Sequence, residues 1–244
     1  MSYLNAVILD TETTGTDHEE DQVIELAHIS LPPTPAEFMA CESMELPWFH
    51  QRYLPSVPIK LGAQAVHNIV LSDLAGCPPA DTLKIDDHGI DLMIGHNVDY
   101  DWRMLGEPEV ARICTLALSR FLFPDADSHT QSAMLYMIAR RQDREADMRE
   151  RLKNAHAALD DIRNCTILLK FLLREASKAG HDVSTWQAVY ELSETARIPT
   201  IMGFGKHKGT PIERGQLDPS YVSWYRRQAE TDPYYIEAFK RAGF

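Results

Sequence analysis

Residues 6–15 read Ala-Val-Ile-Leu-Asp-Thr-Glu-Thr-Thr-Gly, and this stretch decides the fold that the sequence predicts. Four consecutive apolar residues predict a buried β-strand, which ends in two carboxylates, Asp10 and Glu12. Because side chains alternate along a strand, both acids lie on one face and repel each other unless a cation lies between them. A divalent metal site is one interpretation, and a strand that simply ends in a polar turn is the other.

The composition is that of an ordinary globular protein, with 44% apolar and 25% charged residues among 244. This length allows one large domain, or one domain with a small appendage. No stretch approaches the roughly 18 apolar residues of a membrane span, and the N-terminus lacks a signal pattern, so we expect a cytoplasmic protein with no membrane partner. The four cysteines have no paired spacing suited to zinc or disulfides. A net charge of −12 argues against binding nucleic acid through overall basicity, but not against an acidic pocket neutralised by metal.

Apolar runs and turn residues predict the elements that follow the first strand. The second strand should pair with the first as a hairpin across the acidic loop of residues 16–21. The predicted elements are strands over residues 22–31, 48–54 and 90–95, a strand that passes into a helix over 112–123, and helices over 79–88, 131–141 and 184–198, the last with Ser184 as its N-cap.

A second acidic stretch follows the strand over residues 90–95. Residues 95–105 read Gly-His-Asn-Val-Asp-Tyr-Asp-Trp-Arg-Met-Leu. Asp101 therefore lies near a junction between a strand and a helix, where ligands collect in α/β sheets. The alternative is that Asp99 or Asp101 only caps the helix.

A third stretch, residues 154–161, reads Asn-Ala-His-Ala-Ala-Leu-Asp-Asp and leads into apolar residues spaced by three and four. This spacing predicts a long amphipathic helix packed on the sheet. Asp161 precedes Cys165 by one helical step on the buried face, where an unpaired carboxylate is costly and a metal would remove the cost. His156, at the N-terminal end of the helix, reaches back over the same site; alone, it would be a structural hydrogen-bonding residue.

The preceding segment, residues 142–154, mixes charges of both signs with little apolar content. Such runs are typical of a solvated surface helix or loop. The alternative is a basic flank against a phosphate backbone, made of Arg140, Arg141, Arg144, Arg149, Arg151 and Lys153.

Three stretches resemble, in order along the chain, the three exonuclease motifs of the DEDDh family. They are Asp10-x-Glu12, His96-Asn97-x-x-Tyr100-Asp101 and His156-x-Ala158-x-x-Asp161. The resemblance covers about the first 175 residues, and we expect an exonuclease domain over residues 1–178. It implies an α/β, ribonuclease-H-like fold with a mixed five-stranded sheet flanked by helices. It also implies a 3′-to-5′ exonuclease that releases nucleoside 5′-monophosphates.

The resemblance assigns roles to residues that match the motifs. It implies that the four acids of the motifs bind two Mg²⁺ or Mn²⁺ ions and that His156 is the general base. Thr13, Thr14, Gly15 and Asn97 match positions that approach the substrate. His67 is a weaker substrate contact, because Asn68 and Val70 depart from the family's His-Gly-Ile-Thr loop. The four acids are Asp10, Glu12, Asp101 and Asp161.

Residues 179–199 form a predicted connection to a small C-terminal module, residues 200–244. The module contains Phe-Gly-Lys-x-Lys-Gly and Asp-Pro-x-Tyr-x-x-Trp, which resemble the corresponding module of the exonuclease X group. Basic residues between aromatic ones suit phosphates and stacked bases, so Lys206 and Lys208 are predicted substrate contacts. A glycine-rich hairpin that serves as a structural cap is the alternative.

The sequence therefore predicts a metal-dependent exodeoxyribonuclease acting on DNA 3′ ends, with a role in DNA repair. An exoribonuclease of the same family is the alternative. A non-catalytic nucleic-acid adaptor is disfavoured, because such a protein is expected to have lost an acid or the histidine, and all five are present. The sequence leaves the oligomeric state open.

Overall fold

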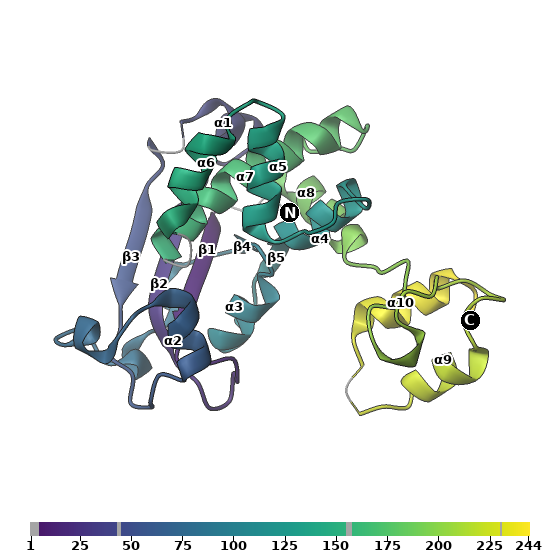
Figure 1. The fold of residues 1–244 in the computed structure, drawn as a ribbon, viewed down its shortest axis with the longest axis horizontal. Helices are drawn as coiled ribbons and strands as arrows, with labels where there is room; N and C mark the ends of the chain where they lie inside the picture. Colours follow the sequence, from purple (N-terminus) through teal and green to yellow (C-terminus); the bar gives the residue numbers. More distant parts are fainter. Residues whose placement is uncertain (1–4, 43–44, 155–157, 230) are drawn as a thin grey trace. The chain divides into compact units, whose positions relative to one another are not determined.

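The computed structural model describes residues 5–42, 45–154, 158–229 and 231–244. Its centre is one mixed sheet with the strand order β3-β2-β1-β4-β5 (Figure 1). β1 pairs antiparallel with β2 and parallel with β4, while β2–β3 is antiparallel and β4–β5 parallel. The strands are β1 Ala6–Thr13, β2 Val23–Ser30, β3 Trp48–Arg52, β4 Leu92–Gly95 and β5 Ala111–Cys114. The predicted five-stranded mixed sheet is confirmed.

The hairpin of β1 and β2 brings the acids of the two strands face to face. Glu12 lies opposite Glu25, and the register then shifts so that Thr13 lies opposite Val23. The third strand was predicted to continue to Leu54 but ends at Arg52, because the backbone of Leu54 bonds to the segment at Pro78 and Pro79 instead.

Helices flank the sheet, and α5, α6 and α7 lie side by side (Figure 1). The prediction of a helix over residues 79–88 is wrong, since two separate 3₁₀ turns occupy that segment. The segment has one proline and three aspartates and offers no apolar stripe to bury, and Gly89 ends it in a left-handed conformation. The α-helices are α1 Pro35–Ala40, α2 Leu61–His67, α3 Asp99–Met104, α4 Thr115–Leu122, α5 Gln131–Arg140, α6 Glu145–Arg151, α7 Ala158–Lys178, α8 Trp186–Ala196, α9 Pro219–Tyr225 and α10 Pro233–Arg241. The 3₁₀ turns are η2 Leu71–Leu74, η3 Ala80–Thr82, η4 Ile85–His88, η5 Leu152–Asn154 and η6 Gly205–His207.

Helix α7 contributes most to the layer over β1 and β2. Its buried positions include Ile162, Cys165, Leu169 and Leu172, spaced by three and four as predicted. Each fully buried leucine of this kind contributes about 1.5–3 kcal/mol by leaving water. The charged segment before it forms α6, which buries none of its residues, in agreement with a solvated surface helix.

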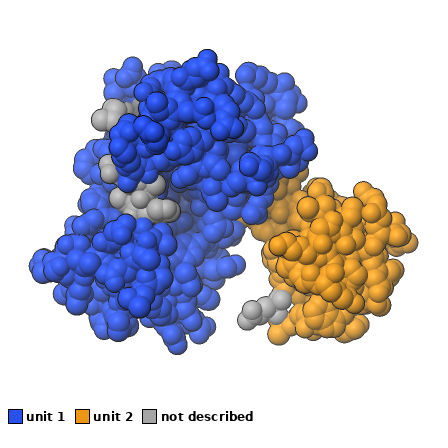
Figure 2. Space-filling model, in the orientation of Figure 1, with its two compact units in different colours: residues 1–193 blue, residues 194–244 orange. Residues whose placement is uncertain are grey.

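The chain divides into two compact units, residues 1–193 and 194–244 (Figure 2). The boundary falls inside α8, which begins one residue after Thr185; the hydroxyl of Thr185, rather than that of the expected Ser184, accepts the Ala188 N–H. The second unit has its own core, built around Met202, Val222 and Phe239. All four cysteines are free. Within the described residues, no helix combines the length and the apolar character that crossing a bilayer requires.

Candidate active site

Three carboxylates meet where β1 approaches the start of α7. Asp10 and Glu12 are two residues apart on β1 and share a face, and Asp161 stands in the first turn of α7 above that face. One carboxylate oxygen of each lies within 4.8 Å of the others. Residues about 150 positions apart in the chain thus form one cluster.

The three acids are kept close at an electrostatic cost. Burial raises the pKa of Glu12 to about 9, and the charges of Asp161, Glu25 and Asp101 add to the shift. Burial, followed by the charges of Asp101, Asp161, Glu12 and Glu25, also raises the pKa of Asp10 well above its ordinary value. Without a cation, this cluster cannot be fully ionised at neutral pH.

The donor set suits a hard divalent cation. Carboxylate oxygens are the ligands that Mg²⁺ and Mn²⁺ prefer, and a bound cation would remove the repulsion that raises these pKa values. The residues present therefore fit the metal that the motifs imply. Asp10, Glu12 and Asp161 are the acids placed to hold it.

Asp101 is hydrogen-bonded to the same strand and lies near enough to act on the charge of Asp10. It is buried in α3, and its Oδ1 accepts hydrogen bonds from the backbone N–H of Thr11 at 2.9 Å and from the Thr11 hydroxyl at 2.7 Å. Burial raises its pKa to about 7 although the Thr11 bonds act in the opposite direction. Asp101 therefore joins α3 to β1 between the two acids of that strand.

His156, the predicted general base, lies outside the described residues. The described chain resumes at Ala158, whose backbone N–H donates to Glu25 Oε2 over 3.0 Å. The first N–H groups of a helix have no partner within the helix, so this carboxylate satisfies one of them and carries the favourable charge for that end. Glu25 thus fixes the start of α7, three residues before Asp161.

Sequence reasoning missed Glu25. It is 1% exposed, and it accepts from Arg52 Nε at 2.6 Å and His50 Nε2 at 2.9 Å, both on β3. Burial alone would raise its pKa, but the bonds from His50, Arg52 and Ala158 hold that pKa below its ordinary value. The only signal in the sequence was an acid within the apolar run of the second strand.

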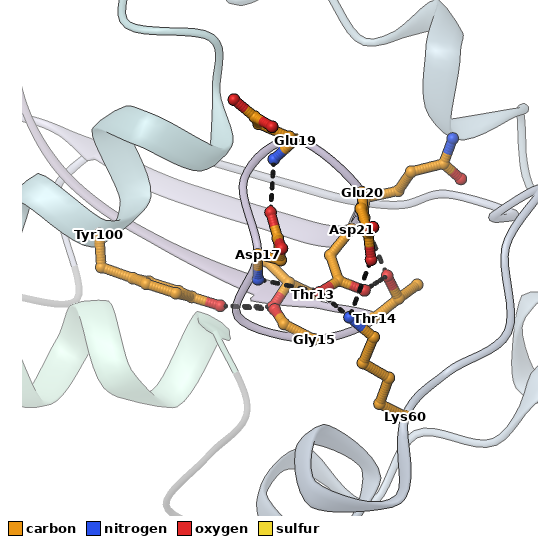
Figure 3. A network of polar contacts seen from close by, with 10 residues as sticks. Thr13, Thr14, Gly15, Asp17, Glu19, Glu20, Asp21, Lys60 and Tyr100 are labelled. Atoms are coloured by element: carbon orange, nitrogen blue, oxygen red, sulfur yellow. Dashed lines mark hydrogen bonds and ion pairs between the residues drawn. The ribbon is translucent and has the colours of Figure 1, made fainter.

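The turn that follows Glu12 is fixed by Tyr100 of α3 (Figure 3). The Thr13 and Tyr100 hydroxyls are 2.5 Å apart, and both donate to the carbonyl oxygen of Gly15, at 2.6 and 3.0 Å. Two hydroxyl groups therefore shape the backbone at the end of β1, beside the carboxylate cluster.

A second set of bonds holds the other side of this turn (Figure 3). Asp21 accepts from the Thr14 hydroxyl at 3.0 Å and from Lys60 Nζ at 2.7 Å. A Cβ atom on Gly15 would lie 2.3 Å from Asp21 Oδ2, so only glycine fits. The side chains of Thr13 and Thr14 are thus occupied within the protein, and Gly15 offers backbone alone.

The two other predicted substrate contacts of the first unit differ in exposure. His67 ends α2, is buried, and accepts the Ile69 N–H on Nδ1; burial lowers its pKa, while the backbone of Thr13 acts in the opposite direction. Asn97 is exposed in the turn between β4 and α3 at φ 72°, a left-handed conformation that asparagine tolerates. Lys206 and Lys208 belong to the second unit, where both are exposed.

Exodeoxyribonuclease 10 of Escherichia coli (strain K12) is 26% identical to the chain over 220 residues, which are 89% of this chain and 88% of the relative. The solved structure of exonuclease X in complex with 5′ overhanging duplex DNA matches with a TM-score of 0.54 at 22% identity, over 75% of this chain and 99% of that one. The chain is similar to exonuclease X. The zinc-bound form of the E. coli ExoI–ssDNA complex matches with a TM-score of 0.54 at 15% identity, over 79% of this chain and 43% of that one.

No protein-family profile matches the chain. The predicted resemblance and the predicted fold are nevertheless confirmed, and the similarity to an exodeoxyribonuclease supports the predicted nuclease.

Proposed function

We propose that the chain is a metal-dependent exodeoxyribonuclease that shortens DNA from its 3′ ends, as DNA repair requires, and releases nucleoside 5′-monophosphates. The cluster of Asp10, Glu12 and Asp161 carries the proposal, because three converging carboxylates form the cation site that phosphodiester hydrolysis needs. The similarity to exodeoxyribonuclease 10 supports DNA as the substrate.

In this mechanism the acids bind cations and the other residues orient the strand. Two Mg²⁺ or Mn²⁺ ions in the cluster would supply an acidified water and neutralise charge on the leaving oxygen. Asp101, held by Thr11, adds negative charge near the cluster and keeps α3 against the strand. His156 accepts the proton of the attacking water, a task that suits an imidazole with an ordinary pKa of about 6.5.

The turn after Glu12 receives the terminal nucleotide. Its backbone is fixed by Tyr100 and by the Asp21–Lys60 pair, so a sugar would meet a backbone of fixed shape at Gly15. A terminus held there would limit cleavage to chain ends, because an internal nucleotide has a following phosphate where the turn lies.

The test is digestion of matched DNA and RNA oligonucleotides that carry a 5′ label, with Mg²⁺, with Mn²⁺ and with EDTA. We expect the labelled DNA to shorten from its 3′ end in steps of one nucleotide, and only when metal is present. An Asp161→Asn variant purified in parallel controls for contaminating nucleases. Endonucleolytic products, cleavage in EDTA, or preferential degradation of RNA would each contradict the proposal.

A further inference from the structure

The second unit exposes both aromatic rings and amines. We define the aromatic–basic face by Phe204, Lys206, Lys208, Tyr221 and Trp224. Trp224 is 47% exposed and Phe204 41% exposed, and both lysines are exposed. Tyr221 is buried beneath them.

The fold holds this face in a fixed shape. Residues 200–212 form a tight hairpin, closed by bonds between Met202, Gly209 and Thr210, with η6 at its tip. The Tyr221 ring of α9 supports the tip: its centroid lies 4.5 Å from that of His207, and Lys206 Nζ lies 5.8 Å from it. The Tyr221 ring therefore helps to position the hairpin against α9, as does the contact of Phe204 with Tyr225 at 5.9 Å between ring centroids.

The two exposed rings pack on different partners. The rings of Trp224 and Tyr221 are 5.3 Å apart, and the ring of Phe204 lies 5.0 Å from that of Tyr235. The core beneath is filled by other side chains, including Met202, Val222 and Phe239. Trp224 and Phe204 thus expose π surface that the core does not require.

Charge distinguishes this unit from the rest of the chain. Residues 194–244 contain eight Lys and Arg against six Asp and Glu, which gives them a net charge of +2. Since the whole chain carries −12, residues 1–193 carry −14. Among the described residues, neither Lys206 nor Lys208 forms an ion pair, whereas Lys240 and Arg241 both pair with Glu237. The nearby Asp218 is occupied as the N-cap of α9, where it accepts the Ser220 N–H at 2.8 Å.

We propose that the aromatic–basic face is a second binding site, one that takes single-stranded DNA. Lys206 and Lys208 would contact phosphates, and bases would stack on Trp224 and Phe204, the combination by which proteins bind single strands without reading sequence. The phosphates of DNA complement a unit of positive charge on an otherwise acidic chain. Binding of DNA at this face does not depend on the proposed nuclease function. Its use, to retain a strand for repeated cleavage, does rest on that function.

Binding of a labelled oligothymidylate of about 16 nucleotides to the full chain in EDTA tests this without hydrolysis. Fluorescence anisotropy gives the affinity at about 50 to 200 mM KCl. The double variant Lys206→Ala, Lys208→Ala should make the logarithmic salt dependence shallower by about 0.7 for each phosphate that the protein no longer neutralises. Trp224→Leu, which keeps apolar volume but removes the ring, should weaken binding about 5- to 150-fold, and Trp224→Phe should restore most of it.

The control is Lys240→Ala with Arg241→Ala, which removes the same charge from α10 of the same unit. It should change the salt dependence much less, because both side chains are already paired. Circular dichroism of each variant verifies that the unit stays folded. Unchanged affinity and salt dependence in the folded Lys206, Lys208 and Trp224 variants would overturn the proposal, as would an equal effect of the control pair. Failure of DNA hydrolysis in the wild type would instead refute the nuclease while leaving this binding result intact.

Discussion

Replacing Glu12 with glutamine should make the metal-free protein more stable at pH 7 to 8. The folded protein keeps a proton on Glu12, with a pKa of about 9, whereas the unfolded chain releases it near the ordinary value of 4.5. Between these values the folded state binds more protons than the unfolded state, so stability falls as the pH rises. Glutamine has the same shape and nothing to ionise.

The size of the effect follows from the proton linkage. Each fully linked proton changes the free energy of unfolding by about 1.4 kcal/mol per pH unit. Over the roughly 2.5 pH units from the ordinary pKa to pH 7, the wild type loses up to about 3 kcal/mol at this residue. Glu12 is 9% exposed, so water screens part of its charge. We therefore expect Glu12→Gln to raise the measured free energy of unfolding by about 1 to 3 kcal/mol.

The assay is urea unfolding followed by circular dichroism in EDTA between pH 7 and 9. This window avoids His28 and His96, each with a pKa of about 4 in the folded protein. Those histidines act in the opposite sense, since they reduce stability as the pH falls below about 6.5. Glu19→Gln removes an exposed acid of the 16–21 loop and is the matched control.

Magnesium should reverse the order of the two proteins. A ligand at about 1,000 times its dissociation constant stabilises the folded state by about 4.1 kcal/mol, more than the roughly 1 to 3 kcal/mol that Glu12→Gln gains without metal, and the variant should largely lose this stabilisation. The reasoning would be refuted if Glu12→Gln were less stable than the wild type in EDTA at pH 8, or if both proteins gained equally from magnesium.

The remaining predictions concern the other groups of the site. Asp161→Ala should abolish metal-dependent hydrolysis, measured on end-labelled DNA, without lowering the melting temperature in EDTA; residual activity in the pure variant would exclude the assignment. His156→Ala should slow turnover by about two to four orders of magnitude with unchanged Mn²⁺ affinity in a calorimetric titration, and a joint loss of affinity would make His156 a ligand. Glu25→Ala should weaken Mn²⁺ binding by releasing the start of α7, whereas Glu25→Gln, whose amide oxygen still accepts the Ala158 N–H, should retain most of it; equal losses would indicate that the charge of Glu25, not its hydrogen bond, matters.

Local signals in the sequence sufficed for the strands and for the long helix. An apolar run that ends in an acid marks β1, and the apolar spacing of three and four marks α7, because each pattern records which face of the element is buried. The same periodicity placed Asp10 and Glu12 on one face of the strand. The ordered motifs then brought Asp161 to that face through a family resemblance, a step that periodicity alone could not take.

Other features depend on contacts that no local pattern records. The bond from Ala158 to Glu25 joins residues 133 positions apart, and Glu25 resembles any acid in a strand until β3 supplies Arg52. Helix α1 is too short for periodicity, although Thr34 and Glu37 form a capping box that the sequence displayed. Thr14 fits the motif as a substrate contact, but its hydroxyl already bonds to Asp21.

The distance along the chain between β1 and Asp161 sets when a ribosome can produce a working site. Asp10 and Glu12 are translated first, and Asp161 follows about 150 residues later, roughly 8 to 30 s at the usual rates of synthesis. On the proposed assignment, a nascent chain carries two of its three clustered cation ligands during that interval and lacks Asp161. A chain that stalls or is cut before α7 therefore poses no danger to nucleic acid, however well its first strands have folded.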